Sequence, residues 1–279
     1  MMHRRLSALA CGLSLCIGTA AGGAAIQTQP EAAAPAQRSG TSFPQAINAA
    51  PVFTADMVEP DAVDALKKMS AYLMSLQTVE IRSEGSLDVV TGENQRIQMD
   101  GVTNYKIRRP GFAIDYVSDI KTRRFIYDGK TFTVYSPKLD FYASVPAPPT
   151  NREVLDTLYQ KFGIALPLED LFRWADPDGV REQALKSAYF VGTATLGGFA
   201  TDHYAFREDD VDWEVWIQQG DQPLPRKLVI VDRTDAANPT FNTRLSWKVN
   251  PVLADSDFTF VPDKDAKRIQ LATYKGSGE

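Results

Sequence analysis

Thiol and imidazole groups are nearly absent from this chain of 279 residues. Its two cysteines, Cys11 and Cys16, lie in an apolar N-terminal stretch, and its two histidines are His3 and His203. If the N-terminal stretch is removed, no thiol is left, which excludes disulfides, a thiolate metal site and a cysteine nucleophile. One histidine then remains for any imidazole chemistry.

No apolar run in the chain is long enough to cross a bilayer. The longest one, near the N-terminus, is typical of a targeting segment. A basic start is followed by apolar residues at 6–17, fewer than the roughly 20 that cross a bilayer, and by small residues at 18–25. This order predicts a signal peptide over residues 1–25 and export to the periplasm, without a transmembrane span in the mature chain. Lipidation of Cys16 is disfavoured because the bulky Leu15 precedes it.

The chain has no excess of positive charge. It contains 30 Lys and Arg residues against 35 Asp and Glu residues, and its formal net charge is -5. A nucleic-acid partner calls for the opposite balance, so none is expected. The acidic balance fits an exported protein that does not adhere to anionic membranes by charge.

One domain is predicted between two segments without packed structure. Residues 26–56 are rich in Ala, Pro, Ser and Gln, which is typical of a flexible arm. Residues 266–279 are expected to form a C-terminal tail. Residues 57–265 are predicted to form a single domain, which is long enough to bury most of its surface.

Helices are predicted at the front and in the middle of this domain. Apolar residues at helical spacing predict a helix over about residues 60–77. A capping box at Thr150 predicts a second helix that ends at Gly163, and a short third helix is expected over residues 167–174. Alternating apolar residues predict strands at 79–90, 95–107, 111–118, 123–128, 131–136, 139–145, 187–196, 200–207, 211–219, 226–234, 240–249 and 257–261.

The spacing of the strands predicts their arrangement. Short connections, such as the turn at Asp128 and Gly129, imply antiparallel neighbours. A sheet of this size does not stay flat, because the twist of its strands accumulates, and the helices must bury their apolar faces against it. We therefore expect an α+β fold: a curved antiparallel half-barrel of about 11 strands with helices on its concave side.

Sequence signals for catalysis are weak. His203 lies in an alternating strand pattern, where a lone histidine is usually structural, and no G-x-S-x-G elbow accompanies it. The acids between Glu208 and Glu214 lack the spacing and glycine of a calcium loop, so a solvated turn is expected there. No catalytic residue, metal or cofactor is predicted, although a pair of hydrolase carboxylates leaves no spacing signature and stays open.

The stretch IRRPGF places two arginines beside a proline, where one strand should end and the next begin. Strand alternation puts Tyr105, Ile107 and Arg109 on one face. Lys106 and Arg108 fall on the other face, which is expected to be solvated. Arg109 then either meets acceptors in apolar surroundings, such as helix C-terminal carbonyls, or reaches solvent along its own alkyl stem.

Five stretches carry a family resemblance through their order and spacing. They are RRPGFAIDY (108–116), YDGKTFTVYSPKLDFY (127–142), ALPLEDLF (165–172), LPRKLVIVD (224–232) and DFTFVP (257–262). Together they resemble the LolA/LolB-like superfamily of periplasmic lipoprotein carriers, and most closely an uncharacterised family of predicted periplasmic proteins within it.

The resemblance implies an incomplete antiparallel barrel, closed by helices, with an apolar cavity that takes acyl chains. In the lipoprotein carrier, the arginine directly before the strand-starting proline bonds to the lid helix and holds the empty cavity closed. Arg109 matches that residue and is the candidate lid latch. The candidate ligand-cavity or lid residues are Tyr105, Ile107, Phe112, Ile114, Leu155, Leu158, Phe162 and Phe172.

Three functional hypotheses follow. The first is an exported soluble protein that binds a lipid, a lipoprotein acyl chain or another hydrophobic ligand in a helix-lidded cavity, for transport in the envelope. The second is an envelope sensor or protein-interaction module, with a protein partner and a filled cavity. The third, ranked last, is a carboxylate-based hydrolase.

Overall fold

The computed structural model describes residues 57–166, 168 and 182–273. The expected signal peptide and arm lie outside these residues, and so does nearly all of the short helix expected over 167–174.

The helices are α2 (Pro60–Ser75), α3 (Asn151–Phe162), and the 3-10 helices η2 (Glu182–Ala184) and η3 (Asp255–Phe258). The strands are β1 (Thr78–Val90), β2 (Arg96–Arg108), β3 (Phe112–Ser118), β4 (Thr122–Tyr127), β5 (Thr131–Ser136), β6 (Phe141–Pro146), β7 (Ser187–Leu196), β8 (Phe199–Arg207), β9 (Val211–Gln218), β10 (Pro225–Asp232), β11 (Thr240–Val249) and β12 (Lys267–Arg268).

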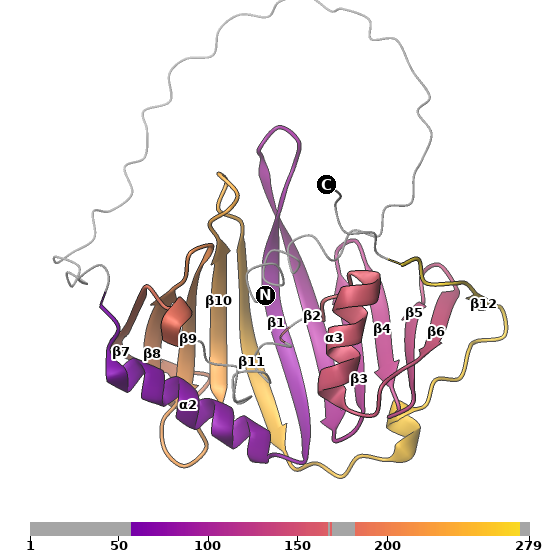
Figure 1. The fold of residues 1–279 in the computed structure, drawn as a ribbon, viewed down its shortest axis with the longest axis horizontal. Coiled ribbons are helices and arrows are strands. Elements are labelled where there is room, and N and C mark those ends of the chain that lie inside the picture. Colours follow the sequence, from indigo (N-terminus) through magenta and orange to yellow (C-terminus); the bar gives the residue numbers. More distant parts are fainter. Residues whose placement is uncertain (1–56, 167, 169–181, 274–279) are drawn as a thin grey trace, which may run out of the picture.

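All of these strands belong to one sheet, in the order β12-β6-β5-β4-β3-β2-β1-β11-β10-β9-β8-β7. Each half of the sheet follows the chain, and the two halves meet where β1 pairs antiparallel with β11. Only the short β12 pairs parallel, with β6. Figure 1 shows an open sheet with β7 at one end and β12 at the other. The predicted α+β fold, an antiparallel half-barrel with helices, is confirmed.

Eleven of the predicted strands agree with observed strands to within a few residues, but the strand predicted over 257–261 is wrong. Its alternating aromatics, Phe258 and Phe260, pack onto the sheet from outside instead of joining it. The Phe260 ring centroid lies 5.4 Å from that of Tyr135. The sheet gains β12 instead, which lies past residue 265, where a tail was expected.

Both α-helices cover the same side of the sheet, which we call the inner face. In Figure 1, α2 runs across the β7–β11 half and α3 lies in front of β3 and β4. The helices contribute Leu66, Met69, Leu73, Val154 and Leu158 to one continuous core. Strand residues in this core include Val79, Ile81, Tyr105, Phe112, Ile114, Tyr127, Phe132, Phe206, Trp213, Val215, Ile217, Leu228 and Leu245.

Local sequence explains where the helices begin and end. Pro60 occupies the first turn of α2, where its missing N–H and fixed φ are tolerated. Thr150 caps α3: its Oγ1 accepts the Glu153 N–H at 3.2 Å and donates to Glu153 Oε2 at 2.8 Å. Gly163 ends the helix with φ 65°, as predicted. In the described part of the chain, no helix has the length and hydropathy needed to cross a membrane.

The junction between the two halves of the sheet depends on a glycine. Gly85 of β1 lies opposite Thr243 of β11. A Cβ atom at Gly85 would lie 2.0 Å from the backbone oxygen of Asn242 and 2.7 Å from Thr243 Cα. Because both obstacles are backbone atoms, a side chain here would push β1 and β11 apart.

We expect Gly85→Ala to lower the free energy of unfolding by about 3 kcal/mol, since overpacking against backbone is hard to relax. Urea unfolding followed by circular dichroism measures the change. Gly92→Ala is the matched control, because no atom lies within 4 Å of the added Cβ there. Equal stability of the two variants would contradict this account of the junction.

The opposite side of the sheet, the outer face, is covered at β2–β6 by the C-terminal segment. Phe258 of η3 is 1% exposed. The Arg108 guanidinium lies 4.1 Å from the centre of its ring and pairs with Asp255, and Lys106 Nζ lies 2.5 Å from Asp257 Oδ1. The face of Lys106 and Arg108, which was expected to be solvated, is therefore solvated only in part, because the acids of η3 bring the C-terminal segment onto it.

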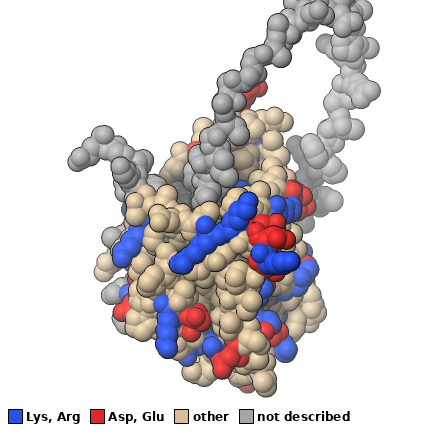
Figure 2. Space-filling view, turned by 90° about the vertical axis from the view of Figure 1, so that its right-hand side faces the viewer, with Lys and Arg blue, Asp and Glu red and all other residues tan. Residues whose placement is uncertain are grey.

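Charges of both signs alternate over this end of the molecule. Figure 2, which looks at the side that carries β12, shows Lys and Arg next to Asp and Glu. Because neighbouring charges of opposite sign neutralise one another, this side offers no large field of one sign to a charged partner.

The Asp257 carboxylate makes the docking of this segment sensitive to acid. Its hydrogen bonds from Lys106 and from the Ala254 N–H lower its pKa. A lowered folded-state pKa means that its contribution to stability is complete above about pH 4 and is lost as the pH falls further.

We expect Asp257→Asn to reduce the difference in unfolding free energy between pH 7 and pH 3. Asp265→Asn, an exposed acid of the same segment, is the control and should leave that difference as in the unmodified chain.

Candidate functional site

The structure places the predicted cavity and lid residues in three groups. Those that are fully buried in the inner-face core are Tyr105, Phe112, Ile114 and Leu158. Those that are partly buried and pack against the same core are Ile107, Leu155 and Phe162. Phe172 lies outside the described residues. The described members thus meet on the inner face, on or under α3 and the strands beside it.

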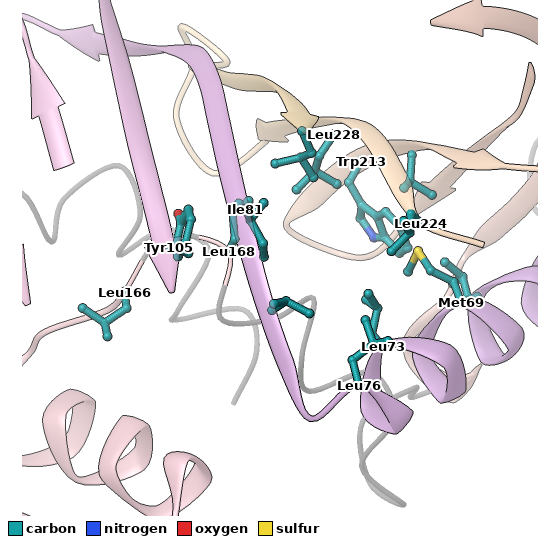
Figure 3. Packing of buried hydrophobic residues seen from close by; sticks show 14 of the residues in the cluster. Met69, Leu73, Leu76, Ile81, Tyr105, Leu166, Leu168, Trp213, Leu224 and Leu228 are labelled. Carbon is teal, nitrogen blue, oxygen red and sulfur yellow. The ribbon is translucent and has the colours of Figure 1, made fainter. Parts of the chain in front are cut away.

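Between the two helices, the described residues that cover the inner face are leucines that follow α3. Leu166 and Leu168 are 1% and 4% exposed and belong to the core. In Figure 3, Leu168 lies beside Ile81 and Tyr105. Both leucines stand in the motif ALPLEDLF, but their burial was not predicted.

Leu168 holds an unfavourable backbone conformation. Its φ is 60°, in the left-handed region that a bulky residue rarely adopts. Such a conformation costs of order 1 kcal/mol or more and persists only where surrounding contacts impose it. The burial of the Leu168 side chain is the contact that offsets this cost here.

Arg109 lies just outside the strand that should have pointed it inward. β2 ends at Arg108, so strand alternation does not extend to Arg109, and the residue is exposed. Its Nη2 donates to Met74 Sδ at 3.3 Å. Because Met74 belongs to the last turn of α2, the guanidinium lies at the C-terminal end of that helix, where a cation is favourable.

The turn that carries Arg109 is held by the first residue of α3. Asn151 Oδ1 accepts the Gly111 N–H at 2.8 Å, and Asn151 Nδ2 donates to the Arg108 carbonyl at 2.9 Å. Gly111 has φ 131°, and a Cβ there would lie 3.1 Å from Arg108 Nε. The Arg109–Pro110 peptide bond is cis. One side-chain amide therefore joins the β2–β3 turn to α3.

Sequence reasoning missed this role of Asn151. The residue stands directly after Thr150 in the predicted capping box, a pattern that predicts no contact for it. An Asn at the first helical position can satisfy backbone donors and acceptors in a distant turn, but the sequence does not show which turn it meets.

Two buried tyrosines of the inner-face core are uncharged. Tyr105 is 2% exposed, and burial raises the pKa of its phenol, so it stays protonated at neutral pH. Tyr127 is buried under the start of α3 and donates its hydroxyl to the Pro148 carbonyl at 2.5 Å. Such a surface suits apolar groups better than it suits acid–base chemistry.

His203 lies on the outer face, away from this core. Its ring stacks on Trp216 with centroids 3.8 Å apart, and its Nε2 lies 2.8 Å from Glu214 Oε2. Lys227 Nζ lies 4.0 Å from the centre of the Trp216 ring on the next strand. These contacts give His203 a structural environment across three neighbouring strands.

The acidic stretch between β8 and β9 is engaged in ion pairs. Both carboxylate oxygens of Asp212 accept from Arg207 at 2.7 Å, and Lys186 Nζ lies 3.1 Å from Asp209. Arg233 donates to the Glu208 carbonyl at 3.1 Å. The turn predicted here is present, but it is only partly solvated, because Glu208 is 3% exposed. Among the described residues, no group of three or more His, Cys, Asp or Glu side chains is placed to hold a metal ion.

Removal of the Asn151 amide should destabilise the fold. We expect Asn151→Ala to lower the free energy of unfolding by about 2 kcal/mol, because the Gly111 N–H and the Arg108 carbonyl lose their partner. Urea unfolding measures this change. Asn104→Ala, at an exposed position on the outer face, should change stability by less than about 0.5 kcal/mol. An equal, small effect of both variants would show that the turn does not depend on Asn151.

Comparison with protein families identifies the class of this chain. The family described as "Predicted periplasmic protein (DUF2092)" matches residues 62–272, which include almost the whole described domain. The chain belongs to this family, and the predicted resemblance is confirmed at that level. Its localisation is the periplasm, as the N-terminal segment predicts. Among curated proteins, none matches the chain.

Several solved structures are similar in general fold at low sequence identity. An uncharacterised conserved protein from Thermus thermophilus is 12% identical, with a TM-score of 0.45 over 75% of this chain and 99% of that chain. LprF from Mycobacterium bovis is 13% identical, with a TM-score of 0.40 over 76% and 100%. The LolA superfamily protein NE2245 from Nitrosomonas europaea is 10% identical, with a TM-score of 0.33 over 71% and 97%.

Proposed function

We propose that this periplasmic protein binds a lipid, a lipoprotein acyl chain or another hydrophobic ligand on the inner face of its sheet, for transport in the envelope. The proposal rests on which residues cover that face. Among the described residues, α2 and α3 cover its two ends, and the cover between them is Leu166 and Leu168, which belong to no helix or strand. Two side chains on a non-helical segment are the simplest part of the core to exchange for a ligand.

The energies of the exchange are small enough to allow it. Burial of one leucine side chain stabilises a fold by about 1.5–3 kcal/mol. An acyl chain that takes the place of Leu168 restores the buried apolar area beside Ile81 and Tyr105, and it releases the strained backbone at Leu168. The ligand therefore needs only apolar surface of similar size, and no covalent chemistry is part of the proposal.

Arg109 is proposed as the latch of this cover. Its contact with Met74 joins the β2–β3 turn to the end of α2, and Asn151 joins the same turn to α3. A side chain in this position resists separation of the two helices. This role agrees with the resemblance to the arginine that precedes the strand-starting proline in the lipoprotein carriers.

We expect Arg109→Leu to remain folded and to take up an apolar probe more readily. The probe is N-phenyl-1-naphthylamine, a neutral dye whose fluorescence rises in apolar surroundings. Loss of one charge-assisted contact corresponds to about fivefold tighter apparent binding if that contact holds the empty state closed. Arg82→Leu is the control, because Arg82 is exposed and pairs with Glu84 on the outer face. Unchanged dye binding by Arg109→Leu would remove the latch role.

A second candidate is an envelope sensor or protein-interaction module with a filled inner face. It is supported by the edge of the sheet at β7, where Ala188 N–H donates to the Met57 carbonyl and the Ala188 carbonyl accepts the Glu59 N–H, both at 2.8 Å. An edge that takes up an extended segment in this way can also take up a strand of a partner. Under this alternative, neither the unmodified protein nor Arg109→Leu binds the dye.

A further inference from the structure

The inner face changes from apolar to cationic along β3, β4 and β5. Nearest α3, Tyr127 of β4 lies opposite Phe132 of β5, and both are completely buried. Two residues further along the same face, Phe125 lies opposite Val134, and both are partly buried. Two residues further again stands Arg123. Each step of two residues along a strand covers about 7 Å.

Arg123 is held in place by neutral groups. Its Nη1 donates to Ser136 Oγ at 2.7 Å and to the Thr122 carbonyl at 2.9 Å. Ser136 is 7% exposed, so the guanidinium is fixed against a buried hydroxyl. Because Nη1 makes both bonds, Nε–H and the hydrogens of Nη2 can face a ligand.

A second cation stands beside it. Lys121 lies two residues before Arg123, in the β3–β4 turn, where its backbone N–H donates to Ser118 Oγ at 3.2 Å. Burial lowers the pKa of both side chains, and Arg123 lowers that of Lys121 further. Lowered pKa values of this kind are expected when two like charges lie close together and have lost part of their hydration.

Neither cation has a carboxylate partner within the described ranges. Asp119, the acid of the same turn, accepts the Asp100 N–H at 2.8 Å instead. The contrast with the next residue is clear: Arg124 points to the outer face, where its Nε lies 3.3 Å from Asp115. Arg123 on the inner face and Lys121 in the turn before it thus carry positive charge that no described carboxylate compensates.

We propose that Arg123 and Lys121 bind the anionic head group, a carboxylate or a phosphate, of an amphiphile whose chain lies along Phe125 and Val134. This inference rests on the proposed function and names the class of its ligand. An anion compensates two cations that have lost part of their hydration, and the planar guanidinium suits the paired oxygens of both head groups. The apolar rows on the same strands set the direction in which the chain runs.

Displacement of bound N-phenyl-1-naphthylamine from the full chain tests this inference. The competitors are dodecanoate, dodecyl phosphate, neutral 1-dodecanol and inorganic phosphate. We expect both anionic amphiphiles to displace the dye at about tenfold lower concentration than 1-dodecanol, and inorganic phosphate to displace none.

Charge-removing variants locate the head group. Arg123→Gln should weaken dodecanoate about tenfold, with 1-dodecanol unchanged. Lys121→Gln should act in the same direction and, since it lies in a turn, keeps the test valid if Arg123→Gln does not fold. Arg124→Gln is the matched control: it removes a charge from the adjacent position on the outer face and should change neither competitor.

The possible results separate this inference from the proposed function. If the dye and 1-dodecanol bind but dodecanoate binds no more tightly than 1-dodecanol, the head-group site is overturned and apolar binding stands. The same conclusion follows if Arg124→Gln weakens dodecanoate binding as much as Arg123→Gln does. If inorganic phosphate protects the chain against heat as well as dodecyl phosphate does, the site takes a free anion and the amphiphile is overturned. If neither the dye nor 1-dodecanol binds, the proposed function itself fails.

Discussion

The apolar inner face of the sheet has to be kept from water, and the remaining structure depends on how it is covered. The core on this face includes residues of the sheet, of α2 and α3, and of the segment that follows α3. Between the helices, the described part of the cover is Leu166 and Leu168. A face covered partly by regular elements and partly by two side chains on an irregular segment is stable as a core, and it is also the place where an apolar ligand has least to displace.

The β2–β3 turn links the parts of this cover. Arg109 contacts α2 through Met74, Asn151 of α3 bonds to the turn backbone, and Arg108 pairs with Asp255 of η3 on the outer face. The charged corner that interrupts the strand pattern therefore serves as a junction for two helices and the C-terminal segment. A ligand that moves either helix acts on this turn, so a change on the inner face can reach the outer face through a few residues.

Much of the fold could be predicted because its signals are local. Alternation marked eleven strands, and the Thr150 cap and Gly163 set the limits of α3.

The predictions that were wrong concern contacts between segments far apart in the sequence. Phe258 and Phe260 alternate as strand residues do, yet they cover the outer face, and the acids beside them neutralise Lys106 and Arg108. Likewise, alternation grouped Tyr105, Ile107 and Arg109, but β2 ends one residue too early for Arg109. The contact of Arg123 with Ser136 likewise depends on the pairing of β4 with β5, which the local pattern of either strand does not contain.

The proposed function requires that the inner face hold a hydrophobic ligand. Native mass spectrometry of the protein purified from its own envelope, followed by lipid extraction, tests this most directly. We expect a bound amphiphile with an acyl chain, present in a defined ratio to the protein and recovered in the extract. A protein that carries the mass of its chain alone, with no lipid in the extract and no uptake of added lipid, would contradict it.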